Sequence, residues 1–192
     1  MSHPALLVID PQVDFLGLVE AGSPQTCGAQ DALAGMELLV AAARAAGAPV
    51  VVTQELHRPS AVDFGRELDG DEPVHCVEGT PGAELLEALR PGPGEHLLRK
   101  RRYSAFFATD LDLLLRGLNV DTVVVCGLLS DVCVQYTCVD AHQLDLHVRV
   151  VPEACAGSSA DASLAAFAAV EYLQRGAILT PEDAAALLGS SA

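Results

Sequence analysis

Short apolar runs alternate with helical segments along almost the whole chain, and this alternation limits the fold more than any other feature. The runs are rich in valine, leucine and isoleucine and lie at 5–9, 49–53, 96–98, 122–126, 147–151 and 177–179. Helical patterns separate most of them, at 31–46, 82–90, 109–116 and 159–174, and a last helix follows at 181. Strands that alternate with helices favour an open, mostly parallel sheet with helices on both faces. We therefore predict a three-layer α/β fold with six strands and one domain over residues 1–192, with loops at 16–29 and 54–81.

The composition suits such a fold. The chain is 51% hydrophobic but only 4% aromatic and has no tryptophan, which indicates a core of alanine, valine and leucine. A formal net charge of −15 argues against nucleic acid or an anionic membrane as a partner. We find no signal peptide and no uninterrupted apolar run of about 18 residues, so we expect a cytoplasmic protein that crosses no membrane. The six cysteines form no CxxC pair, which disfavours a zinc ribbon or a thioredoxin-like site.

The stretch DTVVVCGLLSDVCVQYTCVDA at 121–141 has the features of a reactive centre. A buried strand ends at Gly127, and Ser130 and Asp131 are residues that commonly cap the start of a helix. Cys133 would then lie in the first helical turn, where free N–H groups and the helix dipole lower a thiol pKa from roughly 8.5 to below 7.5. Cys133 is therefore a candidate nucleophile, and the alternative is an inert buried cysteine.

Ionisable residues follow the other predicted strands. Asp10 ends the first, Glu55 and His57 follow the second, and Lys100 follows the third, so all should reach the same edge of a parallel sheet as Cys133. With a strand order of 3-2-1-4-5-6, Asp10 and Cys133 lie on neighbouring strands. Asp10 is then the candidate base and Lys100 its electrostatic partner. The plainer alternatives are a turn residue for Asp10 and a solvated basic run for Lys100.

Three blocks of sequence carry a resemblance to a known family. VIDPQVDF at 8–15, RKRRYSAF at 99–106 and CGLLSDVCV at 126–134 resemble the signature blocks of the isochorismatase-like cysteine hydrolases, which include nicotinamidases, N-carbamoylsarcosine amidases and ureidoacrylate amidases. The resemblance implies a Rossmann-like sheet with a triad of Asp10, Lys100 and Cys133. It also implies a cis peptide before Leu129, an oxyanion hole made by the backbone amides of Leu129 and Cys133, and a homo-oligomer.

The same resemblance implies a reaction. Because Cys133 is present, the resemblance favours amide hydrolysis over the vinyl-ether cleavage of isochorismatase proper. Asp10 would deprotonate Cys133, and the thiolate would attack a small carboxamide or ureido compound to form a thioester. This thiol chemistry needs no cofactor. A catalytically silent member that binds a small metabolite is the alternative from outside the enzymes.

A second possible site lies in the long polar segment. Glu55-x-His57, with His75 eighteen residues further on, resembles the Asp-x-His…His zinc ligands of nicotinamidases, and HCVEGTPGAEL at 75–85 resembles the block that contains the last ligand. The chain departs from that pattern by carrying Glu55 in place of aspartate. The resemblance implies a divalent metal such as zinc and, as a rival function, a metal-dependent nicotinamidase-type enzyme. The alternative is that these side chains only hold the loop.

Several residues near the blocks are candidates for substrate contacts. Arg58, Arg66 and Glu67 could meet a polar substrate at the mouth of a pocket, although surface ion pairs would explain them as well. Phe15, Tyr103 and Phe106 flank the blocks and could form the pocket wall, although each could equally belong to the core.

Overall fold

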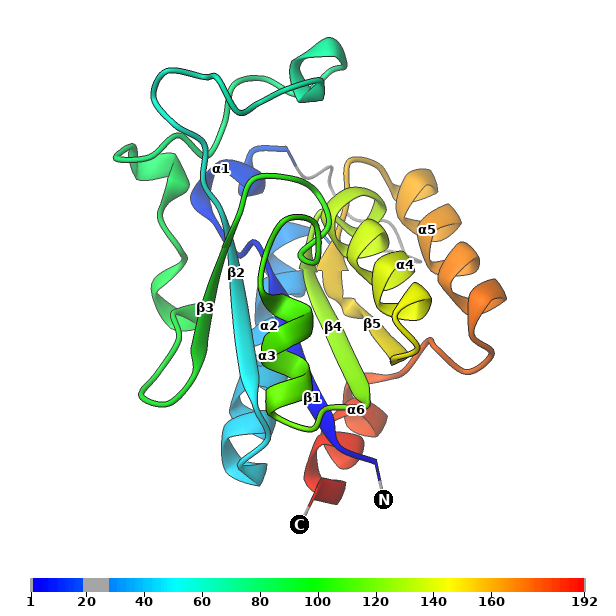
Figure 1. Ribbon diagram of the computed structural model, residues 1–192. Helices are drawn as coiled ribbons and strands as arrows, with labels where there is room; N and C mark the ends of the chain where they lie inside the picture. Colours follow the sequence, from blue (N-terminus) through cyan, green and yellow to red (C-terminus); the bar gives the residue numbers. More distant parts are fainter. Residues whose placement is uncertain (1, 19–27, 192) are drawn as a thin grey trace.

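The central sheet has five parallel strands in the order β3-β2-β1-β4-β5 (Figure 1). The structure, a computed structural model, describes residues 2–18 and 28–191. The strands are β1 (Pro4–Ile9), β2 (Val50–Glu55), β3 (His96–Lys100), β4 (Thr122–Leu128) and β5 (His147–Ala156). The predicted α/β class is therefore confirmed, and the strand order agrees with the prediction from the first strand to the fifth.

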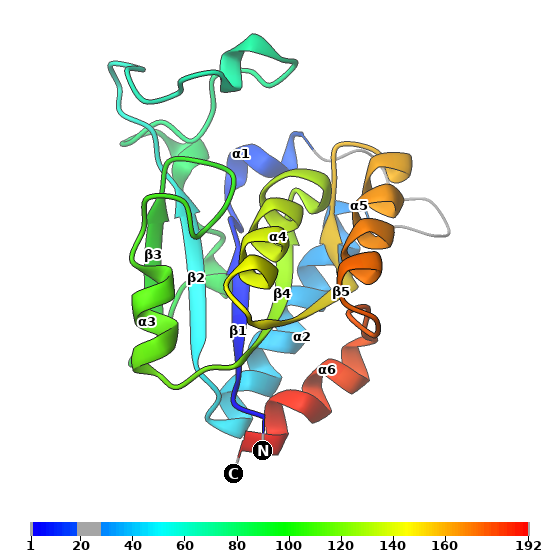
Figure 2. The same cartoon turned by 45° about the vertical axis from the view of Figure 1, so that its right-hand side comes forward.

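Helices cover both faces of the sheet. They are α1 (Val13–Leu16), α2 (Ala29–Ala46), α3 (Leu111–Gly117), α4 (Gln135–Gln143), α5 (Ala160–Leu173) and α6 (Pro181–Leu188). Helices α2 and α6 pack together behind the sheet, whereas α3 and α4 lie in front of it with α5 beside α4 (Figure 2). None of the described helices is both long enough and apolar enough to cross a membrane.

The two central strands, β1 and β4, are buried along their whole length, because their side chains are apolar toward both helical layers. They run in register from Pro4 opposite Thr122 to Ile9 opposite Gly127. Gly127 has a φ of +133°, and a Cβ at this position would lie 2.2 Å from the carbonyl oxygen of Ile9. Only glycine therefore lets the two strands approach so closely next to the ends that carry Asp10 and Cys133.

Two of the predicted strands differ from the structure. The run at 177–179 makes only a single bridge, between Ile178 and Val150, and so does not form a sixth strand. Strand β5 continues through Pro152 to Ala156 instead of stopping at the proline. The pairing of β4 with β5 shifts register between Val125 and Gly127, and this irregularity lets a residue without an N–H group remain in the strand.

The predicted helix at 82–90 is also wrong. The segment forms two short 3₁₀ turns, Pro81–Ala83 and Glu87–Leu89. Between them Leu86 donates its N–H group to the carbonyl of Pro11 over 2.8 Å, so this backbone pairs with the chain that follows β1 instead of with itself. Of the predicted loop at 16–29, residues 19–27 lie outside the described part of the chain.

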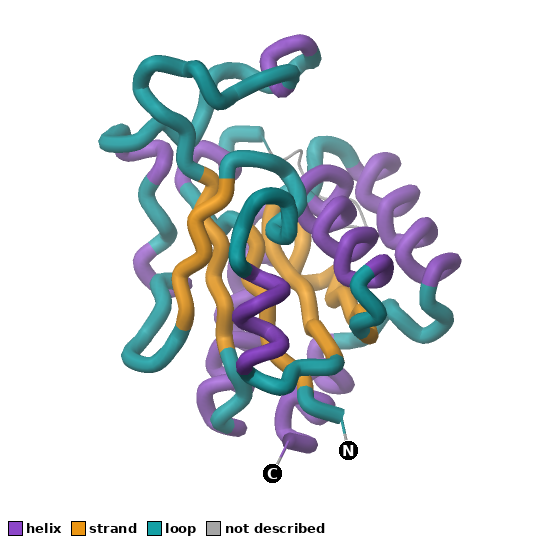
Figure 3. Tube along the Cα trace, in the orientation of Figure 1, coloured by secondary structure: helices purple, strands orange, loops and turns teal. Residues whose placement is uncertain are grey.

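The segment between β2 and β3 extends beyond the sheet edge at which the parallel strands end (Figures 1 and 3). Gln12 fixes its base, because its Nε2 atom donates to the carbonyls of Glu55 (2.8 Å) and Ala83 (2.9 Å) while its Oε1 atom accepts from the Glu55 N–H (2.7 Å). A bridge between His57 and Val77 joins the two arms of the segment. The segment thus brings its own side chains over the ends of the strands.

Candidate active site

The three predicted triad residues lie together at the strand ends. Lys100, at the end of β3, places its Nζ atom 2.6 Å from Oδ2 of Asp10 and 3.4 Å from Sγ of Cys133. All three residues are at most 2% exposed. Because an ammonium group contacts both a carboxylate and a thiol in a dry site, this arrangement can transfer a proton and stabilise the resulting anion.

Asp10 is held in place by two hydrogen bonds with Thr53. Thr53 donates its hydroxyl to Oδ1 of Asp10 over 2.7 Å and accepts the backbone N–H of Asp10 over 2.9 Å. Burial raises the pKa of Asp10 above the ordinary value, while Lys100 opposes the rise and the nearby charge of Glu55 adds to it. A carboxylate with a raised pKa accepts a proton more readily.

Cys133 lies in a tight turn after β4. The turn begins with a cis peptide between Leu128 and Leu129, the position that the family resemblance implied. Residues Ser130–Val134 form a π-helical turn that leads directly into α4. The two amides assigned to an oxyanion hole, those of Leu129 and Cys133, therefore belong to one short turn, and both residues are 2% exposed.

Ser130 and Asp131 do not cap this helix as expected, because the residue at the cap position is Leu129. Ser130 instead shares a 2.7 Å hydrogen bond between its Oγ atom and that of Ser163 in α5. Asp131 accepts the backbone N–H of Ser158 over 2.9 Å. Ser130 therefore fastens the turn to α5, and Asp131 fastens it to the connection between β5 and α5.

The expectation of a lowered pKa for Cys133 is also wrong. Burial raises the pKa of this thiol well above the ordinary value; Lys100 opposes the rise, while Glu55 and Asp10 add to it. The position at a helix start does not outweigh two carboxylates in a dry site. Burial of the thiol beside two carboxylates therefore favours its neutral form.

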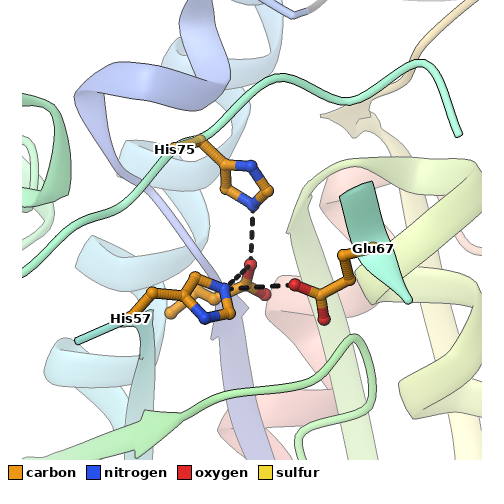
Figure 4. Close-up of side chains that lie close together, drawn as sticks. His57, Glu67 and His75 are labelled. Atoms are coloured by element: carbon orange, nitrogen blue, oxygen red, sulfur yellow. Dashed lines mark hydrogen bonds and ion pairs between the residues drawn. The ribbon is translucent and has the colours of Figure 1, made fainter. Parts of the chain in front are cut away.

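Four side chains of the long segment form a second cluster. Their ligand atoms all lie within 4.8 Å of one another, and they belong to Glu55, His57, Glu67 and His75. His57, Glu67 and His75 point toward a common centre (Figure 4). The Nε2 atom of His57 is 3.2 Å from both Glu55 and Glu67, and that of His75 is 2.9 Å from Glu55. The three predicted metal ligands thus lie together, and Glu67, which the sequence suggested only as a substrate contact, lies with them.

The cluster fits a divalent metal ion. Among the described residues, Oε1 of Glu67 has no hydrogen-bond partner and Oε2 has the 3.2 Å ion pair with Nε2 of His57, which is few contacts for a buried carboxylate unless a cation binds it. The Nδ1 atom of His75 donates to the carbonyl of Pro73 over 2.8 Å, which leaves Nε2 facing the cluster. Two imidazoles with carboxylates form a ligand set that zinc accepts.

Without a metal the histidines hold protons in its place. Burial lowers the pKa of His57, but hydrogen bonds and charges from Glu55 and Glu67 outweigh burial and raise it to about 9. His75 shifts in the same direction, mainly through Glu55. The ring of His57 also stacks on Phe64 at a centroid distance of 3.9 Å, which fixes its orientation.

The residues predicted to contact substrate have different surroundings. Phe15 is buried with its ring 5.4 Å from that of His75, and Phe106 packs against the core. Arg58 pairs with Asp63 at 2.9 Å, and Arg66 lies at the surface and pairs with Asp69.

Tyr103 lines a cavity of about 320 Å³. Phe107, which the sequence analysis did not single out, lines this cavity and a second one of about 250 Å³ that reaches Lys100. The first cavity is bordered by Arg102, Tyr103, Ser104, Phe107, Tyr136 and Asp140. Phe107 is 60% exposed. Its apolar character is the one signal in the sequence that could have pointed to it, because its place at the cavity wall follows from the fold.

Comparisons with known proteins assign the chain to one family. The isochorismatase domain model matches residues 4–183. The chain is 40% identical to streptothricin hydrolase of Streptomyces noursei over 147 residues, which are 77% of the chain but only 46% of that protein. It is 39% identical to maleamate amidohydrolase of Pseudomonas putida over 80% of the chain and 72% of that protein. The chain thus spans less than half of the first of these relatives.

Solved structures share the fold over nearly the entire chain. An isochorismatase family protein from Desulfovibrio vulgaris superposes with a TM-score of 0.83 at 34% identity and covers 98% of this chain and 99% of its own. A pyrazinamidase of Pyrococcus horikoshii in complex with zinc superposes with a TM-score of 0.78 at 27% identity, over 93% of this chain and 99% of its own.

Proposed function

The chain belongs to the isochorismatase family, and from that premise we propose that it is a cysteine amidohydrolase acting on a small carboxamide or ureido compound. The observation that carries the proposal is the position of Lys100, whose Nζ atom contacts Asp10 at 2.6 Å and Cys133 at 3.4 Å. A structural ion pair needs no buried thiol beside it. A nucleophile does need a base and a cation.

The chemistry follows from these positions. Asp10 takes the proton of Cys133, and the sulfur attacks the amide carbonyl carbon, so that its oxygen becomes an oxyanion held by the amides of Leu129 and Cys133. Asp10 returns the proton to the nitrogen, the C–N bond breaks, and ammonia or an amine leaves a thioester on Cys133. Water, deprotonated by Asp10, then attacks the thioester and releases the acid and the free thiol.

The four-residue cluster adds a metal to this proposal. Glu55, His57, Glu67 and His75 would hold a divalent ion such as zinc, which can polarise a substrate oxygen or nitrogen as a Lewis acid. The buried Glu67 carboxylate, whose Oε1 atom has no hydrogen-bond partner among the described residues, supports this proposal, as does the pyrazinamidase relative, whose structure holds zinc. A metal in this cluster favours, as a second candidate function, a nicotinamidase-type enzyme that depends on the metal.

A catalytically silent, metabolite-binding member is the remaining alternative. The residues Asp10, Lys100 and Cys133 argue against it, because a binding protein gains nothing from a buried thiol between two carboxylates and an ammonium group. Self-association and a cytoplasmic location stay predictions of the sequence.

An ammonia-release screen tests the proposed function. Zinc-supplemented protein is incubated with nicotinamide, pyrazinamide, maleamate, ureidoacrylate and streptothricin, with release of acid product measured in parallel for amides that yield no ammonia. We expect turnover of at least one compound and none with Cys133→Ala. Binding of these compounds without turnover by the intact protein would favour the silent alternative.

A further inference from the structure

The ammonium group of Lys100 has more acceptors than hydrogens. Its Nζ atom lies 2.6 Å from Oδ2 of Asp10, 3.0 Å from the carbonyl oxygen of Arg102 and 3.4 Å from Sγ of Cys133, and it also forms a short contact with Oε2 of Glu55. An ammonium group has three hydrogens. Cys133 is the most distant of these four partners, so the sulfur is the acceptor that Lys100 serves least.

Glu55 connects this ammonium group to the histidine cluster. One carboxylate oxygen, Oε1, faces His57 at 3.2 Å and His75 at 2.9 Å. The other, Oε2, faces Lys100 and lies 3.7 Å from Sγ of Cys133. The carboxylate is 1% exposed, so water does not screen either contact. One side chain thus belongs to both the thiol centre and the cluster.

We propose that Glu55 is a positioning residue that competes with Cys133 for the ammonium group of Lys100, and that a divalent cation in the cluster weakens this competition. A cation bound directly by the histidines and Oε1 would replace the protons that the two imidazoles carry in the metal-free cluster. It would neutralise more of the carboxylate charge than their hydrogen bonds do, because a ligand bond brings the positive charge closer to the oxygen than a hydrogen bond does, so Glu55 attracts Lys100 less strongly. The ammonium hydrogen then becomes available to the sulfur. Metal occupancy would in this way set the reactivity of a thiol that the metal does not need to touch.

The length of the Glu55 side chain is essential to this proposal. A carboxylate one methylene shorter is displaced by about 1.5 Å, the length of one carbon–carbon bond. It cannot keep contacts on opposite sides, to the histidines and to Lys100, at their present distances. Glu55→Asp should therefore keep the charge but lose the simultaneous contacts to the histidines and to Lys100. Glu55→Gln should keep the length of the side chain while removing the charge. This inference rests on the proposed function in treating Cys133 as the nucleophile and the cluster as a metal site.

The test is the rate at which iodoacetamide alkylates Cys133 at a fixed neutral pH, followed by mass spectrometry of the peptide that contains it. Wild type, Glu55→Asp, Glu55→Gln and His57→Ala are each compared after chelation and after addition of zinc. In the chelated state we expect Glu55→Asp and Glu55→Gln to react about fivefold faster than wild type, the size of change expected when one net hydrogen bond finds another partner. His57→Ala keeps Glu55 on Lys100 and removes one of the two imidazoles that face Oε1, so it should react no faster than chelated wild type.

Zinc should accelerate wild type by a similar factor and leave His57→Ala unchanged. Labelling of Cys138, a buried cysteine of α4, and the thermal midpoint serve as controls, because general loosening would increase labelling at Cys138 as well. Equal rates for chelated wild type and both Glu55 variants would overturn the competition, and so would an undiminished zinc response in His57→Ala. The assay needs no substrate, so a screen that finds no amide would count against the proposed function and leave this result standing.

Discussion

The Nζ atom of Lys100 lies 3.4 Å from the Sγ atom of Cys133, although Lys100 ends β3 and Cys133 lies in the turn after β4, with α3 between them in the sequence. The parallel sheet creates this proximity, because β3 and β4 both end at the same edge. Asp10, on the strand that pairs with β4, contacts the same ammonium group. The chemistry of the site therefore depends on the register of the central strands.

Activity should be lost in acid through Asp10. Burial raises the pKa of this carboxyl, and the base form is present only above that pKa, so kcat/KM falls as the pH drops through it. We expect the fall to begin at a higher pH than for an exposed aspartate. A pH profile of kcat/KM measures this. Asp10→Asn should lower the rate by about 10²–10⁴-fold and abolish the fall of kcat/KM at acid pH. If the fall persists in this variant, another group causes it.

The cluster should bind one divalent ion, and Glu67 should contribute to it. Glu67→Ala and His57→Ala remove ligands and should each reduce the zinc content of purified protein by about tenfold or more. Asp69→Ala is the matched control, because Asp69 lies on the same 3₁₀ turn but is exposed and, among the described residues, forms its ion pair with Arg66. Elemental analysis measures the content. Equal zinc in wild type and Glu67→Ala would exclude Glu67 as a ligand.

Metal-free protein should become less stable as the pH rises. The pKa of His57 is raised to about 9 by Glu55 and Glu67, so its protonated form contributes stability that is complete below the ordinary pKa of about 6.5 and is lost as the pH approaches 9. The loss should be on the order of 2 kcal/mol in the free energy of unfolding. Chemical denaturation of chelated protein at pH 6 and pH 9 measures it. His57→Ala should lose the part of this dependence that His57 supplies and keep the part that comes from the raised pKa of His75; an unchanged dependence in that variant would contradict the assignment.

Gly127→Ala should damage both stability and activity. An added methyl would lie 2.2 Å from the carbonyl oxygen of Ile9 in the neighbouring strand, and the φ of +133° is itself unfavourable for alanine. We expect a loss of about 3 kcal/mol or more in the free energy of unfolding. Gly117→Ala is the control, since a Cβ there meets no described atom within 4 Å. Equal stabilities of the two variants would show that the close approach of β1 and β4 is not required.

The sequence predicted the strand ends well because the central strands are apolar runs with clear stops. Asp10, Lys100 and Cys133 follow three such runs, and a parallel sheet brings their ends together whatever the loops do. The predicted starts of the last two helices, at 159 and 181, lie within one residue of the starts of α5 and α6, where Ser159 and Thr180 each accept a backbone N–H as capping residues do.

The features that the sequence did not predict depend on side chains meeting across the fold. Glu67 lies in an irregular segment, where no periodicity indicates which way a residue points. The second contact of Glu55 depends on the length of its side chain relative to Lys100, a distance that only the folded sheet sets. The raised pKa of Cys133 depends on its burial with Asp10 and Glu55, whereas the local helix start alone favoured a lowered value.

A covalent intermediate on Cys133 is the most direct test of the account. Protein mixed with an amide from the screen and quenched in acid within milliseconds should carry the acyl part of that amide on the peptide containing Cys133. Cys133→Ala should show no adduct, lose activity by at least about a thousandfold and keep the thermal midpoint of wild type. Turnover without an adduct on Cys133, together with full activity in Cys133→Ala, would contradict the proposed mechanism.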